Sequence, residues 1–490
     1  MRRLTAALTA SAVLVVGYAA LDAADRVPGL LTTRPLPPPP PTETPGTRTL
    51  PLVPQPSLST SVRMPLGPLA GERAAPSAAG MRTALADVLD LPALADSALV
   101  VRDGQSGEVL FDRGGDELRI PASTTKLLAA AAVGQVFAPD ETLTTVVRQG
   151  EAADEIVLVA GGDSLLAPGA GDPDSVAGRA GLADLADQVA AALADSGIER
   201  VTLSVDESHA PGPNHAPTWG ESFHGLGIVG TVAMLGLSSE RAAANDPAPI
   251  DPVGSAAEAL AALLEERGVS VSAVERDSPA AGPGDRPDET ATATGTPAPS
   301  PRVLGSVESA PVRDQLALAL TDSDNTLTEI LARQAAFRDG AGTDFDEVGA
   351  WIVEQVAALG VDTDGATLAD ASGLSRENRV TAELLTEVLV LGYDGRHPVL
   401  RTALEGMPIA GLSGTLADRF ITDREAPEPA AGRARAKTGT LTGANSLAGS
   451  VVDDDGRLLV FAGLVAGAPT EDARDALDRF VAALADCGCR

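Results

Sequence analysis

The two lysines of this chain are its most unusual residues for chemistry. All the other basic residues are arginines, and the lysines are Lys126 and Lys437. Arginine keeps its proton at any working pH, whereas a lysine removed from water can become neutral and act as a base, or donate as a compact ammonium group. Both positions therefore suggest a task that arginine cannot perform. The alternative is a codon bias against lysine that left two lysines by chance. The neighbouring residues distinguish these two interpretations.

The first lysine lies in the stretch PASTTK, where Ser123 precedes Lys126 by three residues. Residues three apart on a helix lie on the same side, so the Ser123 hydroxyl and the Lys126 amine can meet. The positive end of the helix dipole also favours negative charge on the Ser123 oxygen. A neutral Lys126 could then remove the serine proton and make Ser123 a nucleophile. The S-x-x-K spacing alone is a weak signal.

A second polar group consists of Ser323, Asp324 and Asn325, at the start of the stretch TDSDNTLTEILARQ. The apolar positions that follow predict a helix. Ordinary helix N-capping also explains this group, because all three residue types are favoured at that position.

The second lysine opens the stretch KTGT, formed by Lys437, Thr438, Gly439 and Thr440. A glycine in a strand allows another element or a ligand to approach closely. The lysine ammonium and the two threonine hydroxyls would suit recognition of a carboxylate. The alternative is an exposed basic edge strand, since further arginines lie just upstream.

Two predicted β-hairpins frame these motifs. Residues 97–113 and 445–465 each contain two β-rich runs around a glycine-containing turn. A helix that opens at Pro121 is apolar on nearly every side and is expected to be buried, and a C-terminal helix is predicted from Glu471 with Thr470 as its cap. Strands near both ends with helices between them predict a mixed α/β (α+β) fold, with a central antiparallel sheet flanked by helices.

The middle of the chain is predicted to be an inserted smaller domain. Short strands are expected in EIVLVAGGDSLL and ERVTLSVDES, and a helix over residues 255–268 with a capping box from Ser255 to Glu258. Residues 277–302 have low complexity and no periodicity, which predicts a surface loop.

The N-terminus carries an export signal. A positive start is followed by an uncharged, mostly apolar run of 18 residues from Leu4 to Leu21, which directs a chain through a membrane. This run is marginal for a spanning helix and long for the core of a signal peptide, so cleavage and a retained anchor both stay open. The next stretch, RPLPPPPPTETPGTRTLPLVPQP, predicts an extended spacer. We therefore expect an extracytoplasmic protein, secreted or anchored on the outer face of the cytoplasmic membrane.

At 490 residues the chain is long enough for two or more domains. The predicted division is a signal peptide or membrane anchor at 1–27, a Pro-rich linker at 28–80, a main domain at 81–149 and 306–490, and an inserted domain at 150–305.

Composition excludes several kinds of partner. The formal net charge of -32 argues against nucleic acid, whose binders present basic faces. The two cysteines, Cys487 and Cys489, are separated by one residue, which would strain a bridge between them, and they cannot assemble a metal site. Three histidines lie in SHAPGPNHAPTWGESFH beside two acidic residues, but their spacing fits no zinc pattern. We therefore expect no metal and no cofactor.

Taken together, the three motifs resemble the S-x-x-K, S-D-N and K-T-G set of the penicillin-binding proteins and serine β-lactamases. The long interval between Lys126 and Ser323 is typical of the D-alanyl-D-alanine carboxypeptidase/endopeptidase family S13, which is similar to penicillin-binding protein 4. GGDSLL at 161–166 and DASGLSRENRVTA at 370–382 resemble further segments of that family, with Ala371 where glycine is usual. The resemblance covers roughly residues 80 to 485.

This resemblance implies a β-lactamase/transpeptidase-like domain and a serine D,D-carboxypeptidase, which acts on the D-Ala-D-Ala end of peptidoglycan stem peptides and is acylated by β-lactam antibiotics. An additional D,D-endopeptidase activity stays open. The implied roles are a nucleophile for Ser123, a general base for Lys126, and proton relay and substrate contact for Ser323 and Asn325. The K-T-G-T residues would face the terminal carboxylate, and the backbone N–H groups of Ser123 and Thr440 would form an oxyanion hole.

Two other functions stay open at this point: a serine β-lactamase, and a slow wall-binding or β-lactam-sensing protein. A triad hydrolase is disfavoured, because no G-x-S-x-G motif occurs. Contact with a membrane is expected only through an uncleaved N-terminal segment.

Overall fold

The structure is a computed structural model that describes residues 76–276, 301–421 and 429–489, all within the compact unit Gln55–Arg490. The predicted signal peptide or anchor and most of the Pro-rich linker and the low-complexity loop lie outside the described residues. In the part that is described, no helix combines the length and the apolar character needed to cross a bilayer.

The main sheet joins the two ends of the described chain. Its strands, in spatial order, are β2 (Val109–Arg113), β1 (Ser97–Asp103), β10 (Leu458–Ala466), β9 (Ala444–Val452) and β8 (Ala434–Leu441). All neighbouring pairs are antiparallel. The two predicted hairpins and the predicted central antiparallel sheet are therefore confirmed.

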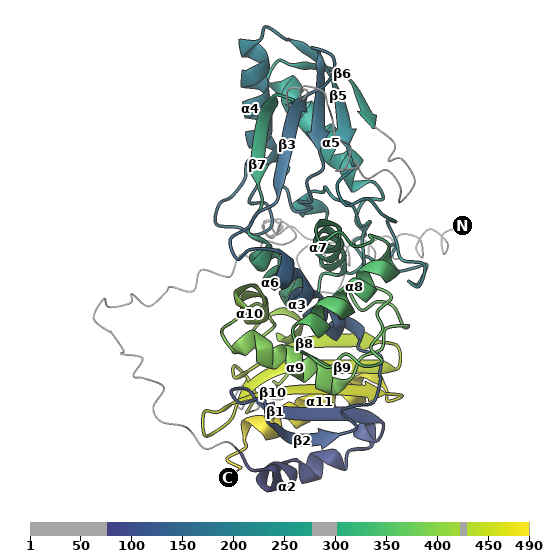
Figure 1. Ribbon diagram of the computed structural model, residues 1–490, viewed down its shortest axis with the longest axis vertical. Coiled ribbons are helices and arrows are strands. Elements are labelled where there is room, and N and C mark those ends of the chain that lie inside the picture. The colour runs from purple at the N-terminus through teal and green to yellow at the C-terminus, as the bar shows by residue number, and fades with distance from the viewer. Residues whose placement is uncertain (1–75, 277–300, 422–428, 490) are drawn as a thin grey trace, which may run out of the picture. The chain divides into compact units, whose positions relative to one another are not determined.

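Side chains of β1 alternate between two cores, because successive residues of a strand point to opposite faces. Leu99 packs in one cluster with the helices α2 (Ala78–Leu89) and α11 (Thr470–Ala485). Val100 packs in another cluster, which contains most of α3 (Lys126–Val136). Figure 1 shows this arrangement, with the sheet between the two sets of helices.

Helix α3 lies at the centre of the helical layer. Eight consecutive residues from Lys126 to Val133 are buried, as the apolar pattern predicted. The surrounding helices are α6 (Val312–Asp322), α7 (Asn325–Arg338), α8 (Phe345–Ala358), α9 (Ala382–Tyr393) and α10 (Pro398–Glu405). The prediction placed the start of the α-helix at Pro121, and this was wrong, because a 3-10 turn, η2 (Ala122–Thr125), comes first.

A second sheet forms in the middle of the chain and appears at the top of Figure 1. Its strands, in spatial order, are β6 (Ser270–Arg276), β5 (Arg200–Asp206), β4 (Glu155–Val159), β3 (Thr144–Gln149) and β7 (Val303–Glu308). The parallel pairs β4–β5 and β5–β6 are connected through α4 (Leu182–Asp195) and α5 (Pro252–Glu266). Because β3 and β7 pair, the chain enters and leaves this sheet on adjacent strands.

The predicted start of the helix in this region was wrong. Helix α5 begins at Pro252, and the side chain of Asp251 caps it by accepting from the Gly254 N–H at 2.9 Å. The Asp-Pro pair precedes the predicted Ser255 cap, and proline is favoured in the first turn, so the helix starts one turn earlier. Helix α11 likewise begins one residue early, at Thr470.

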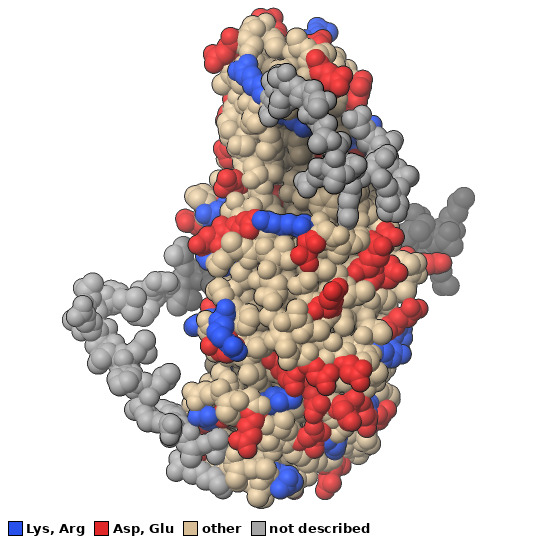
Figure 2. All heavy atoms as spheres, in the orientation of Figure 1, with Lys and Arg blue, Asp and Glu red and all other residues tan. Residues whose placement is uncertain are grey.

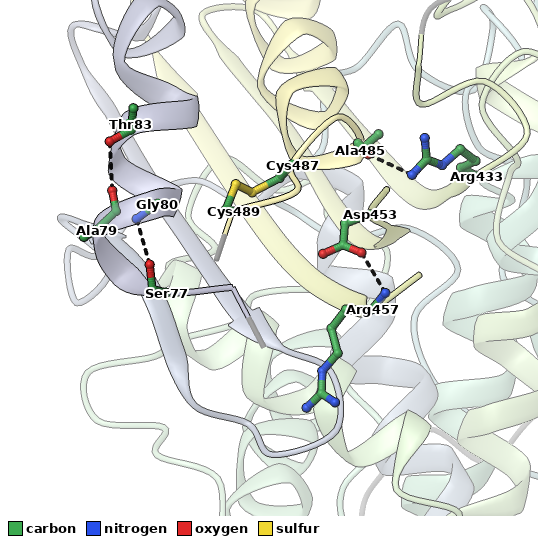
Figure 3. The surroundings of a disulfide bond; sticks show 10 residues. All are labelled: Ser77, Ala79, Gly80, Thr83, Arg433, Asp453, Arg457, Ala485, Cys487 and Cys489. Carbon is green, nitrogen blue, oxygen red and sulfur yellow. Dashed lines mark hydrogen bonds between the residues drawn. A yellow bond between two sulfur atoms is a disulfide. The ribbon is translucent and has the colours of Figure 1, made fainter. Parts of the chain in front are cut away.

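The two ends of the described chain are tied together. Ser77 donates its backbone N–H to the carbonyl of Cys489 at 2.7 Å, and Cys487 and Cys489 form a disulfide bond (Figure 3). Met81 and Leu85 of α2 are fully buried in the cluster that contains α11. These contacts hold α2 and α11 together on one face of the main sheet.

On the face shown in Figure 2, acidic side chains gather over the lower part of the molecule, in the region of the main sheet. This agrees with the formal net charge of -32.

Candidate active site

The Ser123 turn brings a hydroxyl and an amine together. Ala122 has a left-handed backbone, with φ of 49°, and the four residues after Pro121 form η2. In a 3-10 turn residues i and i+3 eclipse each other, and Lys126 Nζ lies 3.3 Å from Ser123 Oγ. Ser123 is half-buried while its neighbours in the turn are buried, so its hydroxyl is the group that a substrate can reach.

Lys126 is held by three acceptors. Besides Ser123 Oγ, its Nζ donates to Asn325 Oδ1 and to the Ser372 carbonyl, both at 2.6 Å. Only 1% of the residue is exposed. Burial lowers the pKa of Lys126 to about 8, against the opposing effect of nearby carboxylates, of which Glu329 is the strongest. An appreciable neutral fraction near neutral pH suits a general base.

In the Ser323–Asn325 turn one residue caps a helix and the other two contact the lysines of the site. Asp324 caps α7, because its side chain accepts from the Leu327 N–H at 2.9 Å. The N-cap interpretation is therefore right for Asp324. The side chains of its neighbours, Ser323 and Asn325, do not cap the helix and are available to the site. Ser323 adopts the left-handed conformation with φ of 58°, and Asn325 donates its Nδ2 to the Ile228 carbonyl at 2.7 Å.

Lys437 is fully buried, so the alternative of an exposed basic edge strand is wrong for it. Its Nζ donates to Ser323 Oγ at 2.8 Å and to the Thr438 carbonyl at 2.7 Å. Burial, together with the nearby charge of Lys126, lowers the pKa of Lys437 well below its ordinary value. Each lysine thus contacts one of the two serines, Lys126 from α3 and Lys437 from β8.

Gly439 allows β8 to lie directly against the Ser123 turn. A Cβ at this position would stand 2.9 Å from the Ser123 nitrogen, 2.8 Å from the Pro121 carbonyl oxygen and 2.1 Å from Ser446 Oγ. Ser446 bridges the strand and the turn by donating to the Pro121 carbonyl at 2.5 Å. The backbone N–H of Ser123 therefore lies beside the strand that carries Thr440.

The remaining K-T-G-T residues present hydroxyl groups. Thr438 is half-buried and its Oγ1 lies 2.8 Å from Thr415 Oγ1. Thr440 is exposed, and its Oγ1 accepts from Arg474 at 3.4 Å. Because residues two apart on a strand share a face, both hydroxyls lie on one side of β8.

A buried carboxylate pair supports this site and was not among the residues predicted for it. Glu329 accepts from the backbone N–H groups of Ala371 at 3.2 Å and Ser372 at 2.7 Å. Burial, together with Asp370, raises the pKa of Glu329 to about 7. Asp370 in turn accepts from Trp219, Gly373, Ser375 and Asn378. The segment DASGLSRENRVTA signalled Asp370, but no local pattern signals Glu329, which sits within an otherwise regular helix.

The histidine segment shows ordinary structural contacts. His209 packs edge-on against Phe337, and His215 against His224. The adjacent Asp206 and Glu207 pair with arginines. Among the described residues, no group of three or more His, Cys, Asp or Glu side chains is placed to hold a metal ion.

Comparison with known proteins decides the family. A family model described as the D-Ala-D-Ala carboxypeptidase 3 (S13) family matches residues 81–230 and 286–486. The chain belongs to this family.

Relatives with similar length support the S13 assignment. Carboxypeptidase DacB of Mycolicibacterium smegmatis is 34% identical over 422 residues, which cover 84% of this chain and 85% of that protein. The D-alanyl-D-alanine carboxypeptidase of Actinomadura sp. is 29% identical over 479 residues, which cover 84% of each chain.

The fold of the S13 chain is that of a solved protein. The crystal structure of penicillin binding protein 4 (dacB) from Haemophilus influenzae has a TM-score of 0.63 and 18% identity, and the match covers 81% of this chain and 97% of that chain. A complex of the same protein with a β-lactam has a TM-score of 0.56. The predicted family, the mixed fold and the serine carboxypeptidase class are confirmed. The roles of individual side chains stay predictions.

Proposed function

We propose that this protein is a serine D,D-carboxypeptidase that removes the terminal D-alanine from peptidoglycan stem peptides and forms an acyl-enzyme on Ser123. One observation carries the proposal: two buried lysines each contact a half-buried serine, Lys126 at Ser123 and Lys437 at Ser323. These four residues come from three separate segments of the chain.

Acylation begins when neutral Lys126 accepts the proton of Ser123 Oγ, which attacks the carbonyl carbon of the scissile D-Ala-D-Ala bond. The tetrahedral oxyanion lies between the backbone N–H groups of Ser123 and Thr440. One donor of this kind typically stabilises a transition state by about 3 to 4 kcal/mol.

The proton then has to reach the leaving amine of D-alanine. Ser323 Oγ, held by Lys437 Nζ at 2.8 Å, provides the relay, and Asn325 holds the substrate amide. Hydroxyls of Thr438 and Thr440 bind the terminal carboxylate. Water then hydrolyses the acyl-enzyme and regenerates Ser123.

The same nucleophile would react with the strained amide of a β-lactam, which resembles the D-Ala-D-Ala end. A serine β-lactamase would differ only in fast hydrolysis of the resulting acyl-enzyme, and a β-lactam sensor in slow turnover of both substrates. Because stem peptides lie outside the cytoplasm, we also propose an extracytoplasmic location. The apolar run Leu4–Leu21 supports this location, as a cleaved signal or as an anchor.

The deciding experiment compares D-alanine release from a peptide ending in D-Ala-D-Ala with nitrocefin hydrolysis by the same preparation. We expect peptide turnover with slow nitrocefin hydrolysis. Fast nitrocefin turnover with an inert peptide would indicate a β-lactamase, and slow turnover of both a sensor. A cross-linked muropeptide dimer as a third substrate tests the endopeptidase activity.

Labelling with a fluorescent penicillin tests the nucleophile. Wild-type protein should be labelled and Ser123→Ala should not. Labelling of Ser123→Ala at another serine would refute the assignment of Ser123.

A further inference from the structure

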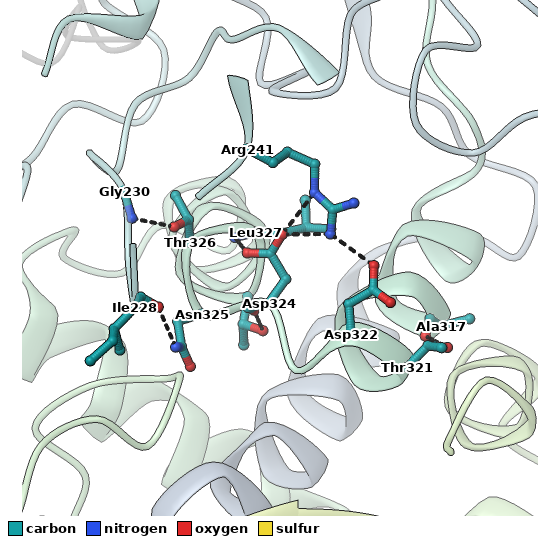
Figure 4. Close-up of polar contacts among 11 residues, drawn as sticks. Ile228, Gly230, Arg241, Ala317, Thr321, Asp322, Asp324, Asn325, Thr326 and Leu327 are labelled. Atoms are coloured by element: carbon teal, nitrogen blue, oxygen red, sulfur yellow. Dashed lines mark hydrogen bonds and ion pairs between the residues drawn. The ribbon is translucent and has the colours of Figure 1, made fainter. Parts of the chain in front are cut away.

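A segment outside the three motifs holds the Ser323 turn in place. This segment, residues 228–241, belongs to the middle of the chain and approaches the start of α7 (Figure 4). The carbonyl of Ile228 accepts from Asn325 Nδ2, and the N–H of Gly230 donates to Thr326 Oγ1, each at 2.7 Å. These bonds fix the orientation of the Asn325 amide, so that its Oδ1 faces Lys126.

Arg241 supplies the charged part of this contact. Its Nε and Nη2 donate to Asp324 Oδ2 at 3.0 and 2.7 Å, and Nη2 also reaches Asp322 Oδ2 at 3.1 Å. The side chains of Arg241 and Asp324 are only 12% and 11% exposed. One guanidinium therefore holds both residues that flank Ser323 in the chain, as Figure 4 shows.

The Ser323 backbone needs such support. A non-glycine residue in the left-handed conformation is less stable than in its usual conformations, and Ser323 has φ of 58°. If Asp322 and Asp324 were released, the turn between α6 and α7 could relax and move the Ser323 hydroxyl away from Lys437. The planar guanidinium, with its several donors, suits two carboxylates better than the point charge of a lysine.

We propose that Arg241 is a positioning residue for acylation, which holds Ser323 and Asn325 in register with the two lysines by binding the carboxylates on either side of Ser323. This inference rests on the proposed function. According to this inference the middle region of the chain contributes to the reaction. Its segment 228–241 completes a site whose other residues lie in the helical layer and on β8.

A change of rate constant distinguishes positioning from simple stabilisation. Loss of stability lowers the fraction of protein that can be labelled, whereas misplacement lowers the rate constant of every folded molecule. For Arg241→Ala we expect the second-order acylation rate constant with a fluorescent penicillin to fall about 10- to 100-fold, since displacements of about 1 Å can have effects of this size. The final labelling stoichiometry of the folded protein should stay that of the wild type.

Chemical rescue gives a second readout. A cavity of about 40 Å³ adjoins Arg241 and Asp324, so removal of the arginine side chain leaves room for a free guanidinium ion. Guanidinium chloride at a low, non-denaturing concentration should raise the acylation rate constant of Arg241→Ala, whereas sodium chloride at the same ionic strength should not. Arg241→Lys should retain part of the rate.

The matched control is Arg267→Ala. Arg267 also pairs with an aspartate of the middle region, Asp187, at 2.6 Å, but neither residue contacts the Ser323 turn. Its rate constant should equal that of the wild type, with or without guanidinium. If Arg241→Ala fails to fold, Asp322→Asn removes one arm of the contact and should lower the rate constant about two- to fivefold, as expected for one partly exposed ion pair.

An unchanged rate constant in folded Arg241→Ala, or in Asp322→Asn where the first variant does not fold, would overturn the inference. So would a lowered rate constant that guanidinium does not raise, or an equal loss in Arg267→Ala. In all of these cases the wild type is labelled, so the acyl-enzyme of the proposed function is not called into question. A wild type that is not labelled would overturn the proposed function and this inference with it.

Discussion

The two lysines of this chain are buried beside serine hydroxyls. Lys126 and Lys437 are at most 1% exposed, and each contacts a serine hydroxyl. A desolvated ammonium loses its proton readily, whereas a guanidinium keeps it and needs more space. At the residue scale, this difference explains why lysine stands at these two positions.

The pH dependence of acylation should report the state of Lys126. The base has to be neutral, and burial lowers the pKa of Lys126 to about 8. The neutral fraction therefore rises with pH, passes one half at this value and levels off above it. Below it, the acylation rate constant should fall about tenfold per pH unit. The measurement is the rate of penicillin labelling from pH 5.5 to about 9.5, and a flat profile would contradict the role of Lys126 as base.

Glu329→Gln should shift that profile. The charge of Glu329 raises the pKa of Lys126, so its removal should lower this pKa and move the midpoint of the rise to lower pH. The rate at the plateau is not the readout, because glutamine keeps only one of the two acceptor oxygens that bind the N–H groups of Ala371 and Ser372. An unmoved midpoint would show that Glu329 does not act on Lys126 through its charge.

Lys437→Arg replaces the amine of Lys437, whose pKa is lowered by burial, with a larger group that stays charged. Lys437 is fully buried and its Nζ lies 2.8 Å from Ser323 Oγ, so a larger, permanently charged group should displace Ser323. We expect the acylation rate constant to fall by about 100-fold or more. Acylation at the wild-type rate would mean that arginine suffices at this position.

At the element scale, one strand has to approach one turn very closely. β8 passes beside η2 only because position 439 has no side chain, and Ser446 bonds the same turn from β9. The contact places β8, which carries Thr440, directly against Ser123. Geometry at this junction therefore controls the donors proposed for the oxyanion.

Gly439→Ala should separate these elements. The new methyl group would meet backbone atoms of Pro121 and Ser123 at 2.8 and 2.9 Å, so the strand or the turn has to move. We expect a fall in acylation rate constant of about 100-fold in a protein that still folds. Gly443→Ala is the control for loss of a glycine in the same hairpin, since no atom lies within 4 Å of its added methyl group. Its positive φ predicts a loss of stability, measured as Tm, without a fall in rate constant.

At the scale of the whole molecule, the site lies between elements that are far apart in sequence. The main sheet takes β1 from the start of the described chain and β8 to β10 from its end, and the Ser323 turn comes from the region between. Helix α2 stabilises the sheet by packing against α11. The stability of the sheet is therefore expected to depend on residues distant from the site.

Leu85→Ala tests this separation of stability from reaction. Leu85 is fully buried on α2, in the cluster that contains α11. Its truncation should lower the free energy of unfolding by about 2 to 5 kcal/mol, as measured by denaturant titration, and should leave the acylation rate constant of the folded protein unchanged. A large fall in that rate constant would show that the α2 face controls the site.

The sequence by itself determined the chemistry of this protein. The interval of three residues between Ser123 and Lys126, the polar group at Ser323–Asn325 and the K-T-G-T stretch indicated a serine nucleophile with a lysine base. Alternating and apolar patterns predicted the two hairpins and the buried helix. These features were readable because each depends on residues close together in the chain, where spacing alone decides which side chains can meet.

Only the tertiary structure decided how the segments combine. In the structure Asp324 caps α7, and buried Lys437 contacts Ser323. Glu329 and Arg241 also support the site, although no local pattern distinguishes them from ordinary helix and loop residues. The physical reason is that burial and long-range hydrogen bonds depend on which elements pack together. The pKa of Lys126 and the position of the Ser323 hydroxyl follow from that packing. Neither can be derived from the sequence without the tertiary structure.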